Sequence, residues 1–238
     1  MITKRQIKLI RSLALKRNRI KHQLFVVEGE KSVKELLSSD YEIDILFATN
    51  KWIKNNLAVN AMAVTNSELS RISNQKTPNE VLAIVKIKNH EIVSDKGGVT
   101  LVLDNINDPG NMGTIIRTCD WFNVQSIICS CETVDMYNPK VVQSAMGSLF
   151  RVAIIYTNLT EYLRHVNTPI YGACLEGQNI KDAILNRNLH LVVGNEANGI
   201  TKDVLSLITS SLHIKRIGKA ESLNVAVATS ILLNKICS

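Results

Sequence analysis

The sequence lacks the segments that mark membrane and secreted proteins. No apolar run approaches the ~20 residues of a membrane span. No charged-then-apolar segment ending in a small-residue cleavage site resembles a signal peptide. Of the 238 residues, 45% are hydrophobic, which permits a sizeable core. We therefore expect one large domain or two ordinary ones, in the cytoplasm and without a membrane partner.

The five cysteines lack the spacing of a metal or redox site. They stand at positions 119, 129, 131, 174 and 237 and form no Cys-x-x-Cys. The five histidines show no zinc-ligand spacing either. We expect no metal site, and reduced, mostly buried thiols.

The first 22 residues contain no aspartate or glutamate. They hold eight of the 28 lysines and arginines, which leaves 20 basic and 21 acidic residues in the rest of the chain. The net charge of +7 is therefore concentrated at the N-terminus, as suits a protein that binds a polyanion such as RNA. The residues expected to contact RNA are Lys4, Arg5, Lys8, Arg11, Arg17 and Arg19.

Two other interpretations of this basic segment are open. One is a solvated amphipathic helix, because Ile7, Ile10, Leu13 and Ala14 form an apolar stripe at helical spacing. The other is an organellar transit peptide, which is also basic and poor in acidic residues. A packed amphipathic helix is compatible with RNA contact, since its basic face would stay exposed.

Apolar segments alternate with helical ones along residues 1–90, which predicts a small α/β domain. We expect strands at 24–27, 43–48, 61–64 and 81–87, and helices at 30–37, at 51–57 and from residue 67 towards Pro78. Residues 89–98 are polar and end in two glycines, which is typical of a linker. A second domain then occupies residues 97–238.

The pattern of the second domain predicts a buried, largely parallel sheet, because short apolar strands alternate with helices. The expected strands are 99–103, 124–128, 152–156, 170–173, 191–193 and 212–214, and the expected helices 111–122, 139–147 and 223–236. Ligands of such sheets bind beyond the carboxyl ends of the strands. The loops 104–113, 194–200 and 215–222 lie at these ends. Neither a dinucleotide fingerprint nor a Walker sequence is present.

Polar side chains on these loops have structural as well as functional interpretations. Arg117 follows the first loop on a predicted helix, where a lone arginine is often only a surface charge. Glu196 stands between Gly194 and Gly199 and could cap a helix. Ser222 could likewise be an N-cap. Taken singly, none of them identifies a site.

Taken together and in order, the segments resemble a known family. Asp108 to Gly113 with Arg117, Gly194 to Gly199, and Ile214 to Asn224 resemble the three motifs of the SpoU (TrmH-like) RNA ribose 2′-O-methyltransferases. The segment from Asn138 to Gly147 resembles a further family segment. Residues 25–31 and Thr77-Pro78 resemble the family's substrate-binding domain, which disfavours the transit-peptide interpretation.

The resemblance implies a fold and a chemistry. The fold would be the SPOUT fold, an α/β sheet with a C-terminal trefoil knot, in a homodimer whose active site lies near the subunit interface. The cofactor would be S-adenosylmethionine, and the substrate RNA, with ribosomal RNA favoured over transfer RNA. The implied catalytic residues are Arg117, Asn111, Glu196, Ser222 and Asn224, and the implied cofactor-binding residues are Gly194, Gly199, Ile214 and Leu223.

The chain departs from the family pattern at two places. Lys215 and Arg216 follow Ile214 where the family usually has Pro-Met, and Ala197 stands where it often has glycine. The first departure leaves open a catalytically inactive RNA-binding protein of the same fold. The presence of Asn111, Arg117, Glu196 and Asn224 favours an active enzyme.

Overall fold

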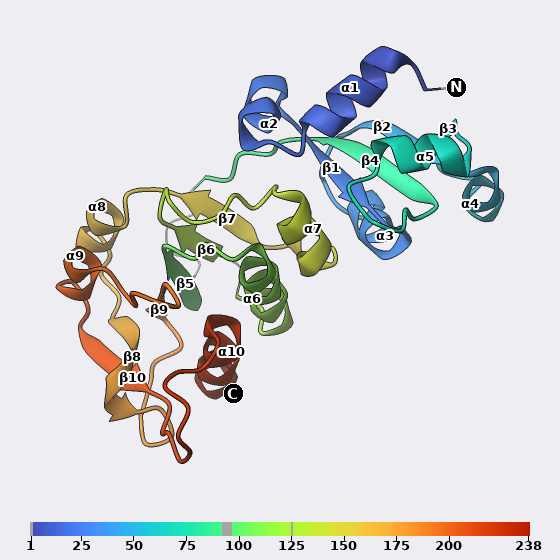
Figure 1. The fold of residues 1–238 in the computed structure, drawn as a ribbon. Helices are drawn as coiled ribbons and strands as arrows, with labels where there is room; N and C mark the ends of the chain where they lie inside the picture. The colour runs from blue at the N-terminus through green and yellow to red at the C-terminus, as the bar shows by residue number, and fades with distance from the viewer. Residues whose placement is uncertain (1, 92–96, 125) are drawn as a thin grey trace. The chain divides into compact units, whose positions relative to one another are not determined.

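The computed structural model describes residues 2–91, 97–124 and 126–238. They divide into a first unit, Met1–Asn89 with Asp135–Phe150, and a second unit, His90–Val134 with Arg151–Ser238 (Figure 1). The expected linker, residues 89–98, lies partly outside the described residues. No helix in the described ranges is both long and apolar enough to cross a membrane.

The first unit is built on a mixed four-stranded sheet. The sheet has the order β1-β4-β2-β3, in which β4 is antiparallel to β1 and β2, and β3 is parallel to β2. The α/β alternation predicted for residues 24–87 is confirmed. The elements are α1 (Lys4–Ser12), α2 (Lys16–His22), β1 (Leu24–Glu28), α3 (Glu30–Leu37), β2 (Ile43–Ala48), α4 (Asn50–Asn55), β3 (Met62–Ala63), α5 (Asn66–Ile72) and β4 (Val81–Lys86), followed later in the chain by α7 (Pro139–Ala145) and η1 (Ser148–Phe150).

The basic N-terminal segment forms two helices with an amphipathic first helix. Thr3 caps α1 in a capping box with Gln6, and Leu13 ends it. Ile10 and Leu13 are buried in the core of the first unit, as the apolar stripe predicts. Ala14 was wrongly included in that stripe: it is exposed, because the helix ends before it.

Arg19 is a correction to the predicted RNA-binding set. Its side chain is only 2% exposed, and its Nε and Nη2 donate to Asp135 Oδ2 at 3.0 and 2.6 Å. Its Nη1 donates to the carbonyl oxygens of Leu13 and Ala14 at 2.8 and 2.9 Å. These bonds engage the whole guanidinium in the interior, so Arg19 holds the first unit together and cannot contact RNA.

Replacing Arg19 by methionine should destabilise the protein by about 3 kcal/mol or more, because the Asp135 carboxylate and two carbonyls would lose their buried partner. Denaturant unfolding measures this change. Arg17→Met is the matched control: Arg17 is exposed two residues away, and its loss should cost less than about 0.5 kcal/mol. Equal stabilities for the two variants would show that the buried ion pair contributes little.

The second unit contains a six-stranded sheet in which all neighbouring strands are parallel, as predicted. The strand order is β10-β8-β9-β5-β6-β7. The elements are β5 (Val99–Asp104), α6 (Pro109–Trp121), β6 (Ser126–Cys129), β7 (Ala153–Tyr156), α8 (Leu159–Arg164), β8 (Ile170–Asn179), β9 (Leu189–Gly194), α9 (Lys202–Leu205), β10 (Ser210–His213) and α10 (Val225–Cys237).

The central strands are apolar on both faces because helices and loops cover both. Leu101, Val102 and Leu103 on β5 and Leu191 and Val192 on β9 are all fully buried. The helices α8 and α9 were not predicted from the sequence. Each is short, so neither carries enough turns for a clear helical period.

The cysteines differ in part from expectation. All five are free thiols, but only Cys119 and Cys129 are buried, whereas Cys131 is exposed and Cys174 and Cys237 are half-buried. Burial raises the pKa of the Cys119 and Cys129 thiols, so these two are inert core residues.

Candidate active site

The candidate site lies at the carboxyl edge of the parallel sheet in the second unit. Strands β5 and β9 are neighbours there, with Asp104 paired in register with Gly194. The loop after β5 leads into α6, the loop after β9 leads to α9, and the segment after β10 leads into α10 (Figure 1). Because the strands are parallel, all three segments begin at the same edge.

Three candidate residues, one from each segment, form a continuous hydrogen-bonded chain. Asn224 Nδ2 donates to Asn111 Oδ1 at 2.9 Å, and Asn111 Nδ2 donates to Glu196 Oε1 at 2.6 Å. The three residues are exposed or half-buried, so a ligand at the sheet edge has access to them. Residues separated by 85 and 113 positions in the sequence therefore meet at one point.

Helix capping fixes the two asparagines. Asp108 is the N-cap of α6, and its Oδ1 accepts the backbone N–H of Asn111 at 2.8 Å. Asn224 is the N-cap of α10, and its Oδ1 accepts the N–H groups of Ala226 and Val227. The capping position considered for Ser222 thus belongs to Asn224. The two caps fix the backbone of Asn111 and the side chain of Asn224, which presents the Asn224 amide to Asn111 in one orientation.

Two residues that were not predicted from the sequence hold the loop after β9 in place. Asp104 is buried and accepts the N–H of Thr201 at 2.7 Å. Asn195 donates to the carbonyl of Asn105 at 2.8 Å and accepts the N–H groups of Ala197 and Asn198. Their one signal in the sequence is their position at the end of a predicted strand, which many polar residues share, so it did not distinguish these two.

The glycines of this loop have different roles. A Cβ on Gly194 would lie 2.2 Å from the carbonyl carbon of Gly199, so only glycine permits this close return of the chain. Gly199 adopts a φ of +67°, which also favours glycine. Ala197 has no positive φ, so alanine causes no backbone strain at the position where the resembling family often has glycine.

Arg117 takes no part in the hydrogen bonds that join Asn224, Asn111 and Glu196. It is exposed on α6 and has no hydrogen bond or ion pair with another residue that the structure describes. Six positions separate it from Asn111, which places the two side chains about 120° apart around the helix. Its neighbour one turn on, Trp121, is 84% exposed. In this chain alone, Arg117 therefore points away from Asn111.

The remaining predicted residues lie along the segment between β10 and α10. Ser222 and Leu223 are exposed, and Ile214 is half-buried. This segment reaches the hydrogen-bonded chain at its end, through Asn224. Among the described residues, no group of three or more His, Cys, Asp or Glu side chains is arranged to hold a metal ion.

The basic residues of the first unit are mostly available to a ligand. Lys4, Arg5, Lys8, Arg11 and Arg17 are exposed, in contrast to Arg19. Arg11 also donates from Nε to the carbonyl of Arg71 at 2.6 Å, which ties α1 to α5 and leaves the charge exposed.

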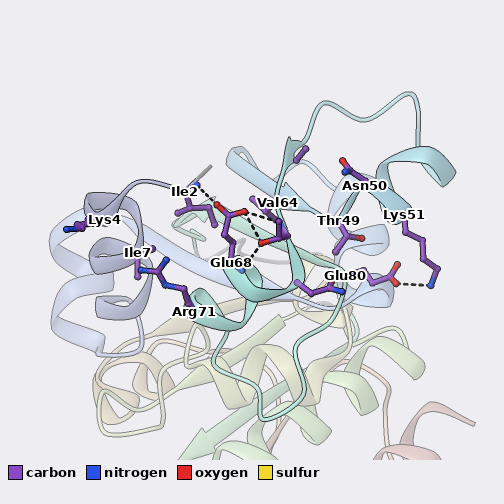
Figure 2. Close-up of a pocket in the computed structure, with 13 residues that line it drawn as sticks. Ile2, Lys4, Ile7, Thr49, Asn50, Lys51, Val64, Glu68, Arg71 and Glu80 are labelled. Atoms are coloured by element: carbon purple, nitrogen blue, oxygen red, sulfur yellow. Dashed lines mark hydrogen bonds and ion pairs between the residues drawn. The ribbon is translucent and has the colours of Figure 1, made fainter.

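A pocket of about 920 Å³ opens beside α1 in the first unit (Figure 2). Lys4 and Arg71 contribute cations to its lining and form no ion pair with a described residue. Its two carboxylates are already engaged. Glu80 pairs with Lys51 at 2.8 Å, and Glu68 accepts backbone N–H groups of Thr65 and Ile2, which lower its pKa. The lining is Ile2, Lys4, Ile7, Thr49, Asn50, Lys51, Ala63, Val64, Thr65, Asn66, Glu68, Arg71 and Glu80.

Known proteins resemble this chain over nearly its whole length. The model of the SpoU rRNA Methylase family matches residues 98–234, and that of the MRM3-like substrate binding domain matches residues 4–83. The Bacillus subtilis protein named 23S rRNA (guanosine(2553)-2′-O)-methyltransferase RlmP is 31% identical over 230 residues, or 94% of this chain and 92% of that protein.

Solved structures extend the likeness to three dimensions. A TrmH-family protein from Porphyromonas gingivalis is 37% identical with a TM-score of 0.90, over 99% of this chain and 98% of that one. The AdoMet-bound rRNA methyltransferase from Sinorhizobium meliloti is 27% identical with a TM-score of 0.87, over 99% of this chain and 95% of that one.

Proposed function

Because the chain belongs to the SpoU rRNA methylase family, we propose that it transfers a methyl group from S-adenosylmethionine to a ribose 2′-hydroxyl of ribosomal RNA. The observation that carries this proposal is the chain of hydrogen bonds from Asn224 through Asn111 to Glu196. It joins the three family motifs at the edge of the sheet where ligands bind. A catalytically inactive RNA-binding protein would not require this arrangement.

The backbone around Gly194, Gly199, Ile214 and Leu223 is proposed to bind S-adenosylmethionine, which supplies an electrophilic methyl group. Two features of the loop after β9 support this proposal. Residues 196–199 are exposed, and the absence of a Cβ on Gly194 lets the backbone of Gly199 and Ile200 return close to it. Asn111, Glu196, Ser222 and Asn224 would orient the ribose by hydrogen bonds. Transfer needs the 2′-hydroxyl in line with the methyl group, so positioning is the main task of these residues.

Arg117 is proposed to stabilise the charge that develops on the attacking oxygen. An arginine guanidinium stays protonated in proteins, so it serves as an electrostatic clamp on ribose or phosphate and not as the base. Since it points away from Asn111 within one chain, we propose that it completes the site across a dimer interface.

The homodimer itself is part of the proposal. Trp121 on α6 and Val227 and Ile231 on α10 are exposed large apolar residues, and α6 and α10 pack together through a contact between Thr118 and Ser230 at 3.2 Å. Val227 and Ile231 stand four residues apart and so share one helix face. A second copy of the chain would cover these apolar side chains.

Light scattering of the full chain should therefore give the mass of two chains at micromolar concentration. Combining Trp121→Glu with Val227→Glu should give a folded monomer, because charges would enter an apolar interface. Ile184→Glu is the control and should leave the dimer intact. Ile184 is 97% exposed and lies on neither α6 nor α10. A monomeric wild-type protein would contradict the proposal.

The knot and the location in the cell are further proposals. Strand β10 lies at the edge of the sheet, yet the chain then returns to its middle, where Asn224 contacts Asn111. We propose that this return passes through the loop after β9 as a trefoil knot, and that the protein acts in the cytoplasm, where ribosomal RNA is available in bacteria.

The domains are proposed to divide the work, with residues 1–90 binding RNA and residues 97–238 transferring the methyl group. The exposed cations of α1 and the pocket beside it support this role of the first domain.

Changing Lys4, Arg5, Lys8 and Arg11 together to glutamine should reduce the slope of log K for RNA against log salt by about 3, because each phosphate contact releases roughly 0.7–0.9 of a counterion. The control changes Lys31, Lys34, Lys54 and Lys76, four exposed lysines of the same unit. Cofactor binding should be unaffected in both variants. An unchanged slope would assign these cations to a solvated helix face.

The function is tested by labelled-methyl transfer from S-adenosylmethionine to 23S rRNA and to tRNA from a strain that lacks the protein. The relative from Bacillus subtilis is named for a 23S rRNA guanosine, so 23S rRNA is the expected acceptor. The label should map to one ribose and not to a base. RNA binding without any transfer would support the inactive alternative.

A further inference from the structure

The loop between β10 and α10 carries a cluster of positive charge that methyl transfer does not explain. Residues 97–238 hold eleven lysines and arginines and eleven acidic residues, so this part of the chain has no net charge. Three of the eleven basic residues, Lys215, Arg216 and Lys219, nevertheless fall within five positions. We name these three the loop cations.

The loop cations are free to meet a large ligand. All residues from 215 to 220 are exposed, and Ile217 among them is 92% exposed, so the segment does not pack against the sheet. None of the loop cations is in an ion pair with a residue in the described ranges. Among the described residues their side chains make a single hydrogen bond, a long one of 3.4 Å from Arg216 Nη1 to the carbonyl of Ala220.

The position of the loop connects these charges to the candidate active site. The same loop ends at Asn224, whose amide donates to Asn111. Lys219 is five residues from Asn224, so even a fully extended chain keeps it within about 17 Å of that residue. A single acidic residue, Glu221, lies between the loop cations and Asn224.

We propose that the loop cations bind the phosphate backbone of the RNA strand beside the ribose that is methylated. The inference rests on the proposed function, because it takes RNA as the substrate. Exposed lysine and arginine side chains without ion-pair partners are suited to phosphate, and arginine also binds it with two parallel hydrogen bonds. The loop then has two tasks: its backbone faces the cofactor, and its cations hold the substrate.

The test compares two triple variants of the full chain. The first changes Lys215, Arg216 and Lys219 to glutamine. The matched control removes three exposed positive charges elsewhere in the second unit, by Arg164→Gln, Lys181→Gln and Lys235→Gln. Binding to an unmethylated 23S rRNA transcript is measured over a range of salt concentrations, and binding to S-adenosylhomocysteine is measured by calorimetry.

The loop variant should bind the transcript on the order of tenfold more weakly at about 0.1 M salt, with a salt slope reduced by about 2. Its affinity for S-adenosylhomocysteine and its single-turnover rate at saturating RNA should stay within twofold of the wild type, and the control should bind RNA normally. An unchanged RNA affinity and slope would overturn the inference. Lost cofactor affinity with intact RNA binding would overturn it as well and assign the cations to the cofactor. A wild-type protein that binds and methylates no rRNA would instead refute the proposed function.

Discussion

Replacing Arg117 by alanine is expected to slow methyl transfer by about 100-fold or more while the fold stays intact. The loss corresponds to about 3 kcal/mol, the usual effect of removing one preorganised group that stabilises charge in a transition state. The folded state should tolerate the change because Arg117 is exposed and its side chain makes no hydrogen bond or ion pair with another described residue. It also lies in a helix, where alanine has a high propensity.

Single-turnover methylation at saturating RNA and cofactor measures this effect, and thermal unfolding checks the fold. Arg117→Lys should recover little activity, because an ammonium cannot reproduce the planar two-pronged contact. Arg164→Ala is the control, as it removes an exposed arginine from α8 and should leave the rate unchanged. If Arg117→Ala keeps a near-normal rate, the role proposed for Arg117 is wrong.

A second large effect is expected from Gly194→Ala, which should weaken cofactor binding by about 100-fold or more. The new Cβ would lie 2.2 Å from the carbonyl carbon of Gly199 and 2.3 Å from the nitrogen of Ile200, both backbone atoms. The loop after β9 would therefore have to move, and with it Glu196 and the backbone proposed to hold S-adenosylmethionine. Calorimetric titration with S-adenosylhomocysteine measures the loss.

Two other glycines separate this effect from a general sensitivity of the loops. In Gly199→Ala the new Cβ would have no atom within 4 Å, but alanine would have to adopt a φ of +67°. This strain should cost about 1 kcal/mol and give an affinity for S-adenosylhomocysteine between those of the wild type and Gly194→Ala. In Gly218→Ala the new Cβ would enter open space at a residue without a positive φ. This variant should bind S-adenosylhomocysteine with wild-type affinity. Wild-type affinity in Gly194→Ala would mean that the cofactor lies elsewhere.

The local elements were predictable because their signals are local. Short apolar runs predicted the strands of both sheets, and a stripe at helical spacing predicted the burial of Ile10 and Leu13. The ordered motifs are sufficient to identify the family, since residues 108–117, 194–199 and 214–224 carry the resemblance. The short helices α2, α8 and α9 were missed because one or two turns give no clear period to detect.

The sequence by itself thus determined the strands, most of the helices, the parallel character of the second sheet and the identity of the family. Only the tertiary structure decided the strand order, the link from Asn224 through Asn111 to Glu196, and the burial of Arg19 against Asp135. The physical reason is distance along the chain. A helix or strand is selected by residues a few positions apart, whereas Arg19 and Asp135 are 116 positions apart. Nothing in the charge pattern of residues 1–22 distinguishes the buried Arg19 from the exposed Arg17, because the carboxylate that neutralises Arg19 is brought to it only by folding.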